Sequence, residues 1–81
     1  MEILKGQLVI PTAGRDKDQI MCVTVAENEY LFLANGRKRK VQNPKKKKQK
    51  HVKLINKEVY NGIFTNKALK KYIRQTGIEE T

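Results

Sequence analysis

Residues 20–36 read IMCVTVAENEYLFLANG, and this stretch decides the fold. Residues 20–25 and residues 30–33 are short runs rich in β-branched and aromatic side chains, which is typical of strands. The polar pair Glu27-Asn28 between them predicts a reversal of the chain. Residues 20–23 and 30–33 are apolar at every position, whereas a strand with one wet face alternates. We therefore expect both faces of these strands to be covered.

A shorter apolar run precedes this stretch. Residues 8–10 are Leu-Val-Ile, a composition typical of a strand, and Pro11 is expected to close the run because it has no amide hydrogen for a ladder bond. The charged residues 15–18 then predict a turn that leads into the strand at residue 20.

The segment after residue 34 predicts a second hairpin. Asn35-Gly36 is a preferred pair in a type I′ turn, because both residues tolerate positive φ. Residues 37–41 are then expected to return as a strand, residues 45–48 to form an exposed loop, and residues 51–54 to add a fifth strand. Short strands joined by tight turns predict a mainly β fold, a small antiparallel five-stranded barrel.

A C-terminal helix is predicted for residues 65–76. Thr65 is a favourable N-cap, and Gly77 is a favourable residue directly after a helix end. We expect its apolar face to lie across the outside of strands 20–23 and 30–33. Residues 1–55 would then form the barrel, and residues 56–81 a C-terminal extension packed on it. The helical period places Ala68, Leu69, Tyr72 and Ile73 on one face and Lys67, Lys70, Lys71 and Arg74 on the opposite one.

The whole net charge of +10 lies in one stretch, residues 37–53. These 17 residues include 10 lysines and arginines and no acidic residue, while the other 8 basic residues balance the 8 acidic ones. Like charges at this density repel one another and must be solvated or neutralised. We therefore expect a polyanionic partner, with a solvated surface that binds nothing as the plainer alternative.

Composition excludes several classes of protein. The chain has one cysteine and one histidine, too few for an internal disulfide or a metal site, and a free cysteine fits a reducing cytosol. No apolar run resembles a signal peptide or a membrane span, and no lipidation signal accompanies the lysine run. We find no nucleophile–base pair, glycine-rich phosphate loop or carboxylate dyad. We therefore expect a cytoplasmic, soluble, monomeric protein that is not an enzyme and needs no cofactor or membrane.

Two segments near the N-terminus resemble a KOW motif, namely residues 6–10 (GQLVI) and residues 13–17 (AGRDK), followed by a hydrophobic strand. Residues 39–45 (RKVQNPK) and 50–52 (KHV) extend the likeness over residues 6–55. The chain is thus similar to the large-subunit ribosomal protein fourteen family of the eukaryotic and archaeal type, and to its small bacterial KOW-domain relatives. The resemblance implies an SH3-like barrel of the KOW type whose loops contact RNA.

One residue departs from the KOW pattern. Asp18 stands where such motifs usually carry glycine. Aspartate is among the few residues that tolerate a left-handed backbone, so the turn can still form with some strain. A carboxylate at this position would, however, repel RNA phosphate.

These observations together predict a non-catalytic RNA-binding protein that acts on ribosomal or other structured RNA in translation, with the large ribosomal subunit as a candidate partner. The alternative is a protein-interaction KOW module that binds an acidic partner. Arginines suit forked contacts and lysines bulk attraction. Gly14 and Gly36 are expected to serve the turns. The candidate RNA-binding residues are Arg15, Lys17, Arg37, Lys38, Arg39, Lys40, Lys45, Lys46, Lys47, Lys48, Lys50, His51 and Lys53.

Several residues have a structural alternative. Arg15 and Asp16 either pair within their turn or contact RNA. The basic face of the helix is either a second phosphate contact or a solvent-exposed surface without a ligand. Cys22 is expected to be a buried apolar residue. The five aromatic residues are expected to pack in the core and against the helix rather than to stack on bases: Tyr30, Phe32, Tyr60, Phe64 and Tyr72.

Overall fold

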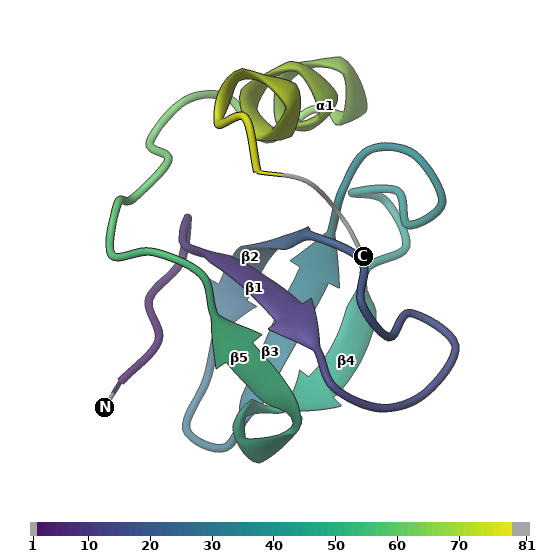
Figure 1. Ribbon diagram of the computed structural model, residues 1–81, viewed down its shortest axis with the longest axis vertical. Helices are drawn as coiled ribbons and strands as arrows, with labels where there is room; N and C mark the ends of the chain where they lie inside the picture. The colour runs from purple at the N-terminus through teal and green to yellow at the C-terminus, as the bar shows by residue number, and fades with distance from the viewer. Residues whose placement is uncertain (1, 79–81) are drawn as a thin grey trace.

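The computed structural model describes residues 2–78, which form a five-stranded antiparallel sheet and a C-terminal helix (Figure 1). The strand order in the sheet is β4-β3-β2-β1-β5. This confirms the predicted mainly β fold; residues 79–81 of the predicted C-terminal extension lie outside the described residues. The elements are β1 (Leu8–Pro11), β2 (Met21–Ala26), β3 (Tyr30–Ala34), β4 (Lys45–Lys48), the 3₁₀ turn η1 (Gln49–His51), β5 (Val52–Leu54) and α1 (Asn66–Gln75).

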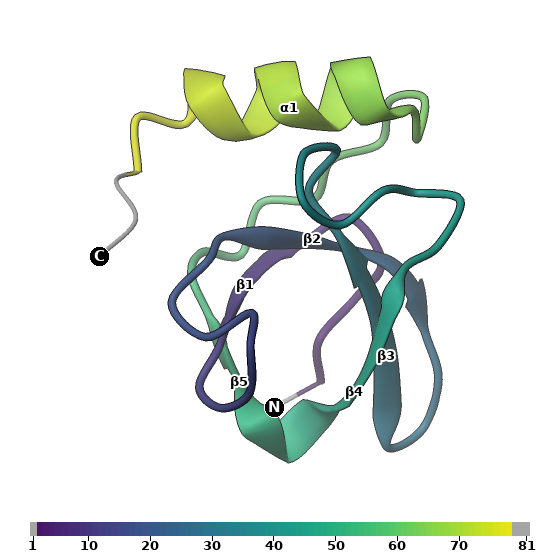
Figure 2. The ribbon, with the colours of Figure 1, turned by 90° about the vertical axis from the view of Figure 1, so that its right-hand side faces the viewer.

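The sheet curls on itself in the manner of an SH3-like barrel (Figure 2). The two edge strands, β4 and β5, are joined by η1, but the sheet is not closed by pairing between them. Hydrogen bonds from η1 hold this corner instead. The Gln49 amide donates to the Glu29 carbonyl at 2.7 Å, and the Thr12 amide donates to the His51 carbonyl at 2.9 Å.

The inside of the barrel holds one hydrophobic cluster. Its members alternate along the strands, because successive side chains of a strand point to opposite faces of the sheet. Val52 and Leu54 of β5 pack against this cluster from the far edge. The buried members are Ile3, Val9, Met21, Val23, Leu31 and Leu33.

The outside of the sheet holds a second cluster, which the helix covers. Leu69 of α1 is fully buried there against Leu8, Cys22 and Ala34 (Figure 2). Burial on both faces explains why residues 20–23 are apolar throughout. Tyr60, Phe64 and Tyr72 pack against this cluster, as expected.

The helix reaches β3 only at its end, so the expectation that it also lies across residues 30–33 is wrong. Tyr30 and Phe32 are half-buried and belong to neither cluster. The reason is the path of the chain, since α1 follows β5, which pairs with β1. The Tyr60 amide in this connection donates to the Gly6 carbonyl at 2.8 Å, which brings the helix over β1 and β2.

The two segments after residue 36 exchange their predicted roles. Residues 37–41 form a loop rather than a strand, and Asn35 does not have the positive φ of a type I′ turn. The four lysines expected to form a loop are β4, which pairs with β3 from Leu33↔Lys45 to Tyr30↔Lys48. The Asn35 side chain explains the loop, because its Oδ1 accepts from the amides of Arg37 and Arg39 at 3.0 and 3.1 Å. Amides bonded in this way cannot pair with β3.

The helix ends agree with the sequence prediction. The Thr65 hydroxyl accepts from the Ala68 amide at 3.1 Å, as an N-cap does. Gly77 follows the last turn with φ 71°. Cys22 is fully buried in β2, as expected, and burial raises the pKa of its thiol to about 12, because a thiolate is poorly solvated there. The thiol therefore stays protonated and unreactive at neutral pH.

Asp18 has the left-handed backbone that the sequence predicts, with φ 68°. Its amide donates to the Pro11 carbonyl at 3.1 Å, which closes the turn between β1 and β2. The loop therefore keeps a conformation that glycine normally provides.

The buried position of Leu69 predicts that the helix is part of the cooperative fold. Leu69→Asp removes the buried side chain of α1 and places a charge in the outer cluster, so we expect at least about 3 kcal/mol of lost stability. For a domain of this size the melting temperature falls by more than about 10 °C, measured by circular dichroism at a strand wavelength. Lys71→Asp, at an exposed position of the same helix, is the matched control. Equal melting temperatures for the Leu69 variant and the control would contradict the docking.

The strained turn gives a second prediction. Asp18→Ala puts a residue without a local hydrogen-bonding side chain at φ 68°, and we expect a loss of about 1–2 kcal/mol in unfolding free energy. Asp18→Gly carries no such penalty and is expected to be at least as stable as the parent protein. Urea unfolding measures both. If the alanine and glycine variants are equally stable, the left-handed backbone at residue 18 is not a constraint.

Candidate nucleic-acid interface

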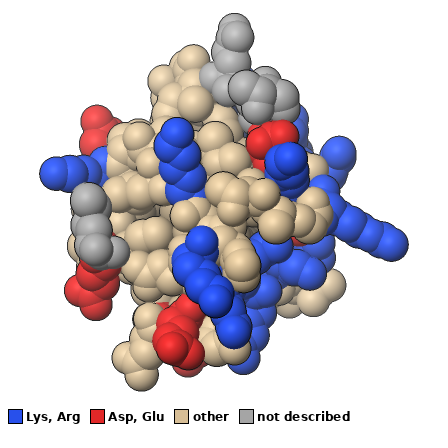
Figure 3. Space-filling model, turned by 60° about the horizontal axis from the view of Figure 1, so that its bottom comes forward, with Lys and Arg blue, Asp and Glu red and all other residues tan. Residues whose placement is uncertain are grey.

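Three segments meet on one side of the molecule, and we call this surface the basic face. It consists of residues 12–19, residues 35–44 and β4, which lie together on the right in Figure 1. These segments carry ten basic and two acidic residues, a net charge of +8. In Figure 3 lysines and arginines are most numerous toward the right and lower part of that view, although others lie at its left and centre. Acidic side chains lie mainly along its left and lower edges, with another near the upper right.

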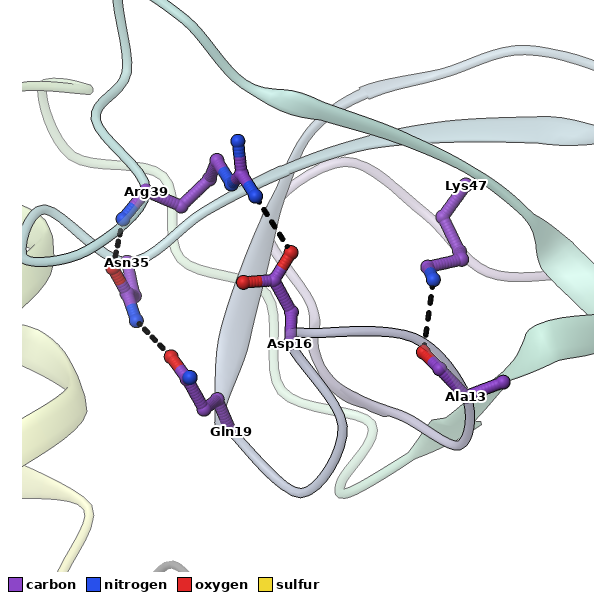
Figure 4. Close-up of polar contacts among 6 residues, drawn as sticks. All are labelled: Ala13, Asp16, Gln19, Asn35, Arg39 and Lys47. Atoms are coloured by element: carbon purple, nitrogen blue, oxygen red, sulfur yellow. Dashed lines mark hydrogen bonds and ion pairs between the residues drawn. The ribbon is translucent and has the colours of Figure 1, made fainter.

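An ion pair joins two of the three segments (Figure 4). The Arg39 guanidinium donates to the Asp16 carboxylate at 2.9 Å, and the two side chains are 27% and 7% exposed. The Asp16 carboxylate thus binds a residue of another segment, a contact that neither sequence alternative for Asp16 predicted. Arg39, a candidate for RNA recognition, has a structural partner across 23 residues of sequence.

Asn35 organises the loop that carries Arg37–Lys40. Its side chain is 2% exposed, and besides accepting from two loop amides it donates to the Gln19 side chain at 3.5 Å (Figure 4). The amides of Asn35 and Gly36 both donate to the Arg39 carbonyl, at 2.9 and 3.0 Å. The sequence analysis missed this role, although asparagine side chains often bond the backbone two residues on.

The four lysines of β4 are not equivalent. Lys45 and Lys47 lie opposite Leu33 and Leu31 and are half-buried, because directly paired residues share a face of the sheet. The Lys47 ammonium crosses the open side of the barrel and donates to the Ala13 carbonyl at 2.9 Å (Figure 4). It thereby ties the third segment of the basic face to the first.

Lys46 and Lys48 lie on the outer face of β4 and are exposed. The Lys46 ammonium lies 4.5 Å from the centre of the Tyr30 ring, a cation–π distance. Of the lysine run, these two side chains are best placed for a ligand.

The remaining candidates divide by position. Gly14 and Gly36 both have positive φ, 86° and 79°, as expected for turn glycines. Lys50, His51 and Lys53 lie on η1 and β5, outside the three segments of the basic face, and all three are exposed. The His51 carbonyl accepts from the Thr12 amide, so η1 borders this face. The exposed cations of the basic face are Arg15, Lys17, Arg37, Lys38, Lys40, Lys46 and Lys48.

The helix is attached directly to the basic face. The Asn66 side chain accepts from the Val41 amide at 2.8 Å and donates to the Gln42 side chain at 2.8 Å. A Cβ at Gly36 would overlap the Asn66 carbonyl oxygen, so the loop approaches the helix as closely as glycine allows. Residues 35–42 are therefore held between the barrel and α1.

Residues 2–78 lack two other functional features. Among these residues no group of three or more His, Cys, Asp or Glu side chains is placed to hold a metal ion. No helix in this part of the chain has the length and hydrophobicity needed to cross a membrane. A scan against protein-family models and a search of curated proteins both gave no match to this chain.

The ion pair predicts a measurable coupling between the two loops. Asp16→Ala, Arg39→Ala and the double variant form a double-mutant cycle in urea unfolding. Because Asp16 is buried and Arg39 largely so, we expect a coupling of about 1–3 kcal/mol, between the values for surface and buried pairs. Lys38→Ala, which removes a charge from an exposed neighbour, is expected to change stability by less than about 0.5 kcal/mol. Additive effects of Asp16→Ala and Arg39→Ala would show that the pair does not hold the loops together.

Proposed function

We propose that this protein is a non-catalytic RNA-binding protein that holds ribosomal or another structured RNA on its basic face. The observation that carries the proposal is the convergence of three loop and strand segments with a net charge of +8 on one side of a small barrel. A surface that only needs to be solvated gains nothing from this convergence, because it brings like charges together. A phosphate backbone would relieve the repulsion.

The physical basis of binding would be neutralisation of phosphates and release of their counterions. Seven exposed cations are available on the basic face. If all seven engage, the slope of log K against log salt is about −5 for a single strand and about −6 for a duplex. Arginine adds forked contacts to phosphate, which a lysine cannot make. Arg15 and Arg37 are thus the best candidates for geometric recognition, since Arg39 is paired with Asp16.

The resemblance to KOW-motif proteins supports the same proposal, because those proteins use the loops of an SH3-like barrel to contact RNA. Under this proposal the chain acts in translation, with ribosomal RNA and the large ribosomal subunit as candidate partners. Under this proposal the protein is also monomeric and cytosolic, and its buried cysteine, Cys22, forms no disulfide.

A second candidate function is a protein-interaction module that binds an acidic partner. It is favoured by the lysine content of β4, because exposed ammonium groups do not distinguish phosphate from carboxylate. The two functions separate when lysate is treated with RNase. If the protein leaves ribosomal particles after digestion, its partner is RNA. If it stays on them, the partner is an acidic protein.

The proposal predicts that the exposed lysines of β4 set the salt dependence of RNA binding. The variant Lys46→Ala/Lys48→Ala is expected to flatten the slope of log K against log salt by about 1.4–1.8, because each phosphate contact contributes about 0.7–0.9. The measurement is fluorescence anisotropy with a short structured RNA hairpin at several salt concentrations.

A charge-matched control separates local contact from net charge. Lys5→Ala/Lys57→Ala removes two exposed lysines. They belong to the segments before β1 and after β5, which run on the left in Figure 1, opposite the basic face, so the slope is expected to stay nearly unchanged. Equal slopes for the two double variants would place the RNA elsewhere. Tighter binding of poly-glutamate than of the RNA hairpin at equal salt would favour the acidic protein partner.

A further inference from the structure

A cleft of about 200 Å³ lies between α1 and the loop that begins at Asn35. Three cations from two distant parts of the chain line it: Arg37 from the loop, and Lys70 and Arg74 from successive turns of the helix. The remaining lining residues are Asn35 and three isoleucines, Ile20, Ile73 and Ile78.

The position of the cleft follows from how the helix is docked. Leu69 fixes α1 on the sheet, and Asn66 fixes its first turn to the loop at Val41. The side of the helix next to Leu69 then faces the start of the loop, where Asn35 is held rigidly by its own hydrogen bonds. The cleft is therefore built by two independently anchored walls.

We infer that this cleft binds a phosphate group, with the RNA backbone as its source, so that the helix and the barrel hold the same RNA. The inference rests on the proposed function and extends it from the basic face to the C-terminal helix. The inference depends on three cations lining the same cleft, whether or not each of them also has a contact within the protein. A phosphate in a cleft lined partly by isoleucines is partly shielded from water, which strengthens its attraction to the cations around it.

The electrostatics of the helix end are compatible with this occupant. The cleft lies toward the C-terminal half of α1, where the helix dipole contributes about half a negative charge. Three full positive charges outweigh that half charge. Arg74 could alternatively serve only to stabilise the C-terminal end of the helix through its dipole. A measurement of RNA binding distinguishes this role from contact with a ligand.

The test uses two double variants of the same helix. Lys70→Ala/Arg74→Ala removes two cations that line the cleft, whereas Lys67→Ala/Lys71→Ala removes two exposed cations that do not. We expect the cleft variant to weaken binding of a structured RNA hairpin about tenfold or more, because two charge-assisted contacts are lost. The control is expected to change Kd by about twofold, through long-range charge alone. Thermal melting checks that both variants remain folded.

A second arm identifies the source of the phosphate. Inorganic phosphate is titrated into the labelled protein, and amide shifts are followed by NMR at residues 35–37 and 70–78. If the cleft variant weakens RNA binding as expected, the RNA backbone is the source. Phosphate-induced shifts at these residues, with RNA binding equal in both helix variants, would assign the cleft to free phosphate and overturn its place in the RNA site.

The failure of the inference and the failure of the proposed function give different results. Equal RNA affinities for the two helix variants, with no phosphate-induced shifts in the cleft, would overturn the inference while RNA binding itself stands. If the parent protein binds no RNA, the proposed function fails, and the phosphate titration alone then decides whether the cleft is an anion site.

Discussion

Burial of β1 and β2 on both faces is the constraint on which the rest of this structure depends. Val9 and Met21 point into the barrel, and Leu8 and Cys22 point out of it into the cluster under α1. Burying each large apolar side chain contributes about 1.5–3 kcal/mol, and the outer set stays exposed unless the helix covers it. The helix is therefore required by the sheet, and its position brings Lys70 and Arg74 beside the basic loop.

The same scaffold holds together charges that repel one another. The segments of the basic face are joined by specific contacts rather than by their own attraction. Arg39 binds Asp16 across two loops, and the Lys47 ammonium binds the Ala13 carbonyl across the open side of the barrel. In each contact one cation of the basic face bonds another segment of the protein, while neighbouring cations face solvent. The cost of the remaining repulsion is smallest when a polyanion is bound.

Much of the fold could be predicted from local sequence, because the strongest signals are short-range. Apolar runs predicted β1, β2 and β3, and the Thr65 cap with Gly77 predicted the helix. The segment from residue 35 to residue 48 could not be predicted in this way. Asn35 bonds the loop amides with its side chain, and Asn66, 25 residues from Val41, bonds another. The strand β4 was not predicted, because four identical lysines show no alternation of apolar and polar residues. Only pairing with β3 decides which of them face inward and which face outward.

The candidate site was predicted by composition but not by geometry. The density of lysine and arginine identified the segment, and nothing in the sequence could assign Arg39 to Asp16 or bring Arg37 to the helix. Such contacts depend on how separate elements dock, which a linear pattern does not encode. Lysines of the same run consequently have different roles. The Lys47 ammonium bonds the Ala13 carbonyl, while Lys46 and Lys48 face solvent.

The central claim is that the barrel presents one cationic side to RNA. The most direct measurement is an amide shift map of purified, nucleic-acid-free protein titrated with a ribosomal RNA fragment at physiological salt. The account predicts perturbations concentrated in residues 12–19 and 35–48, with residues 2–7 and 55–62 unchanged. Absence of any perturbation, or perturbations centred on the opposite side of the barrel, would contradict it.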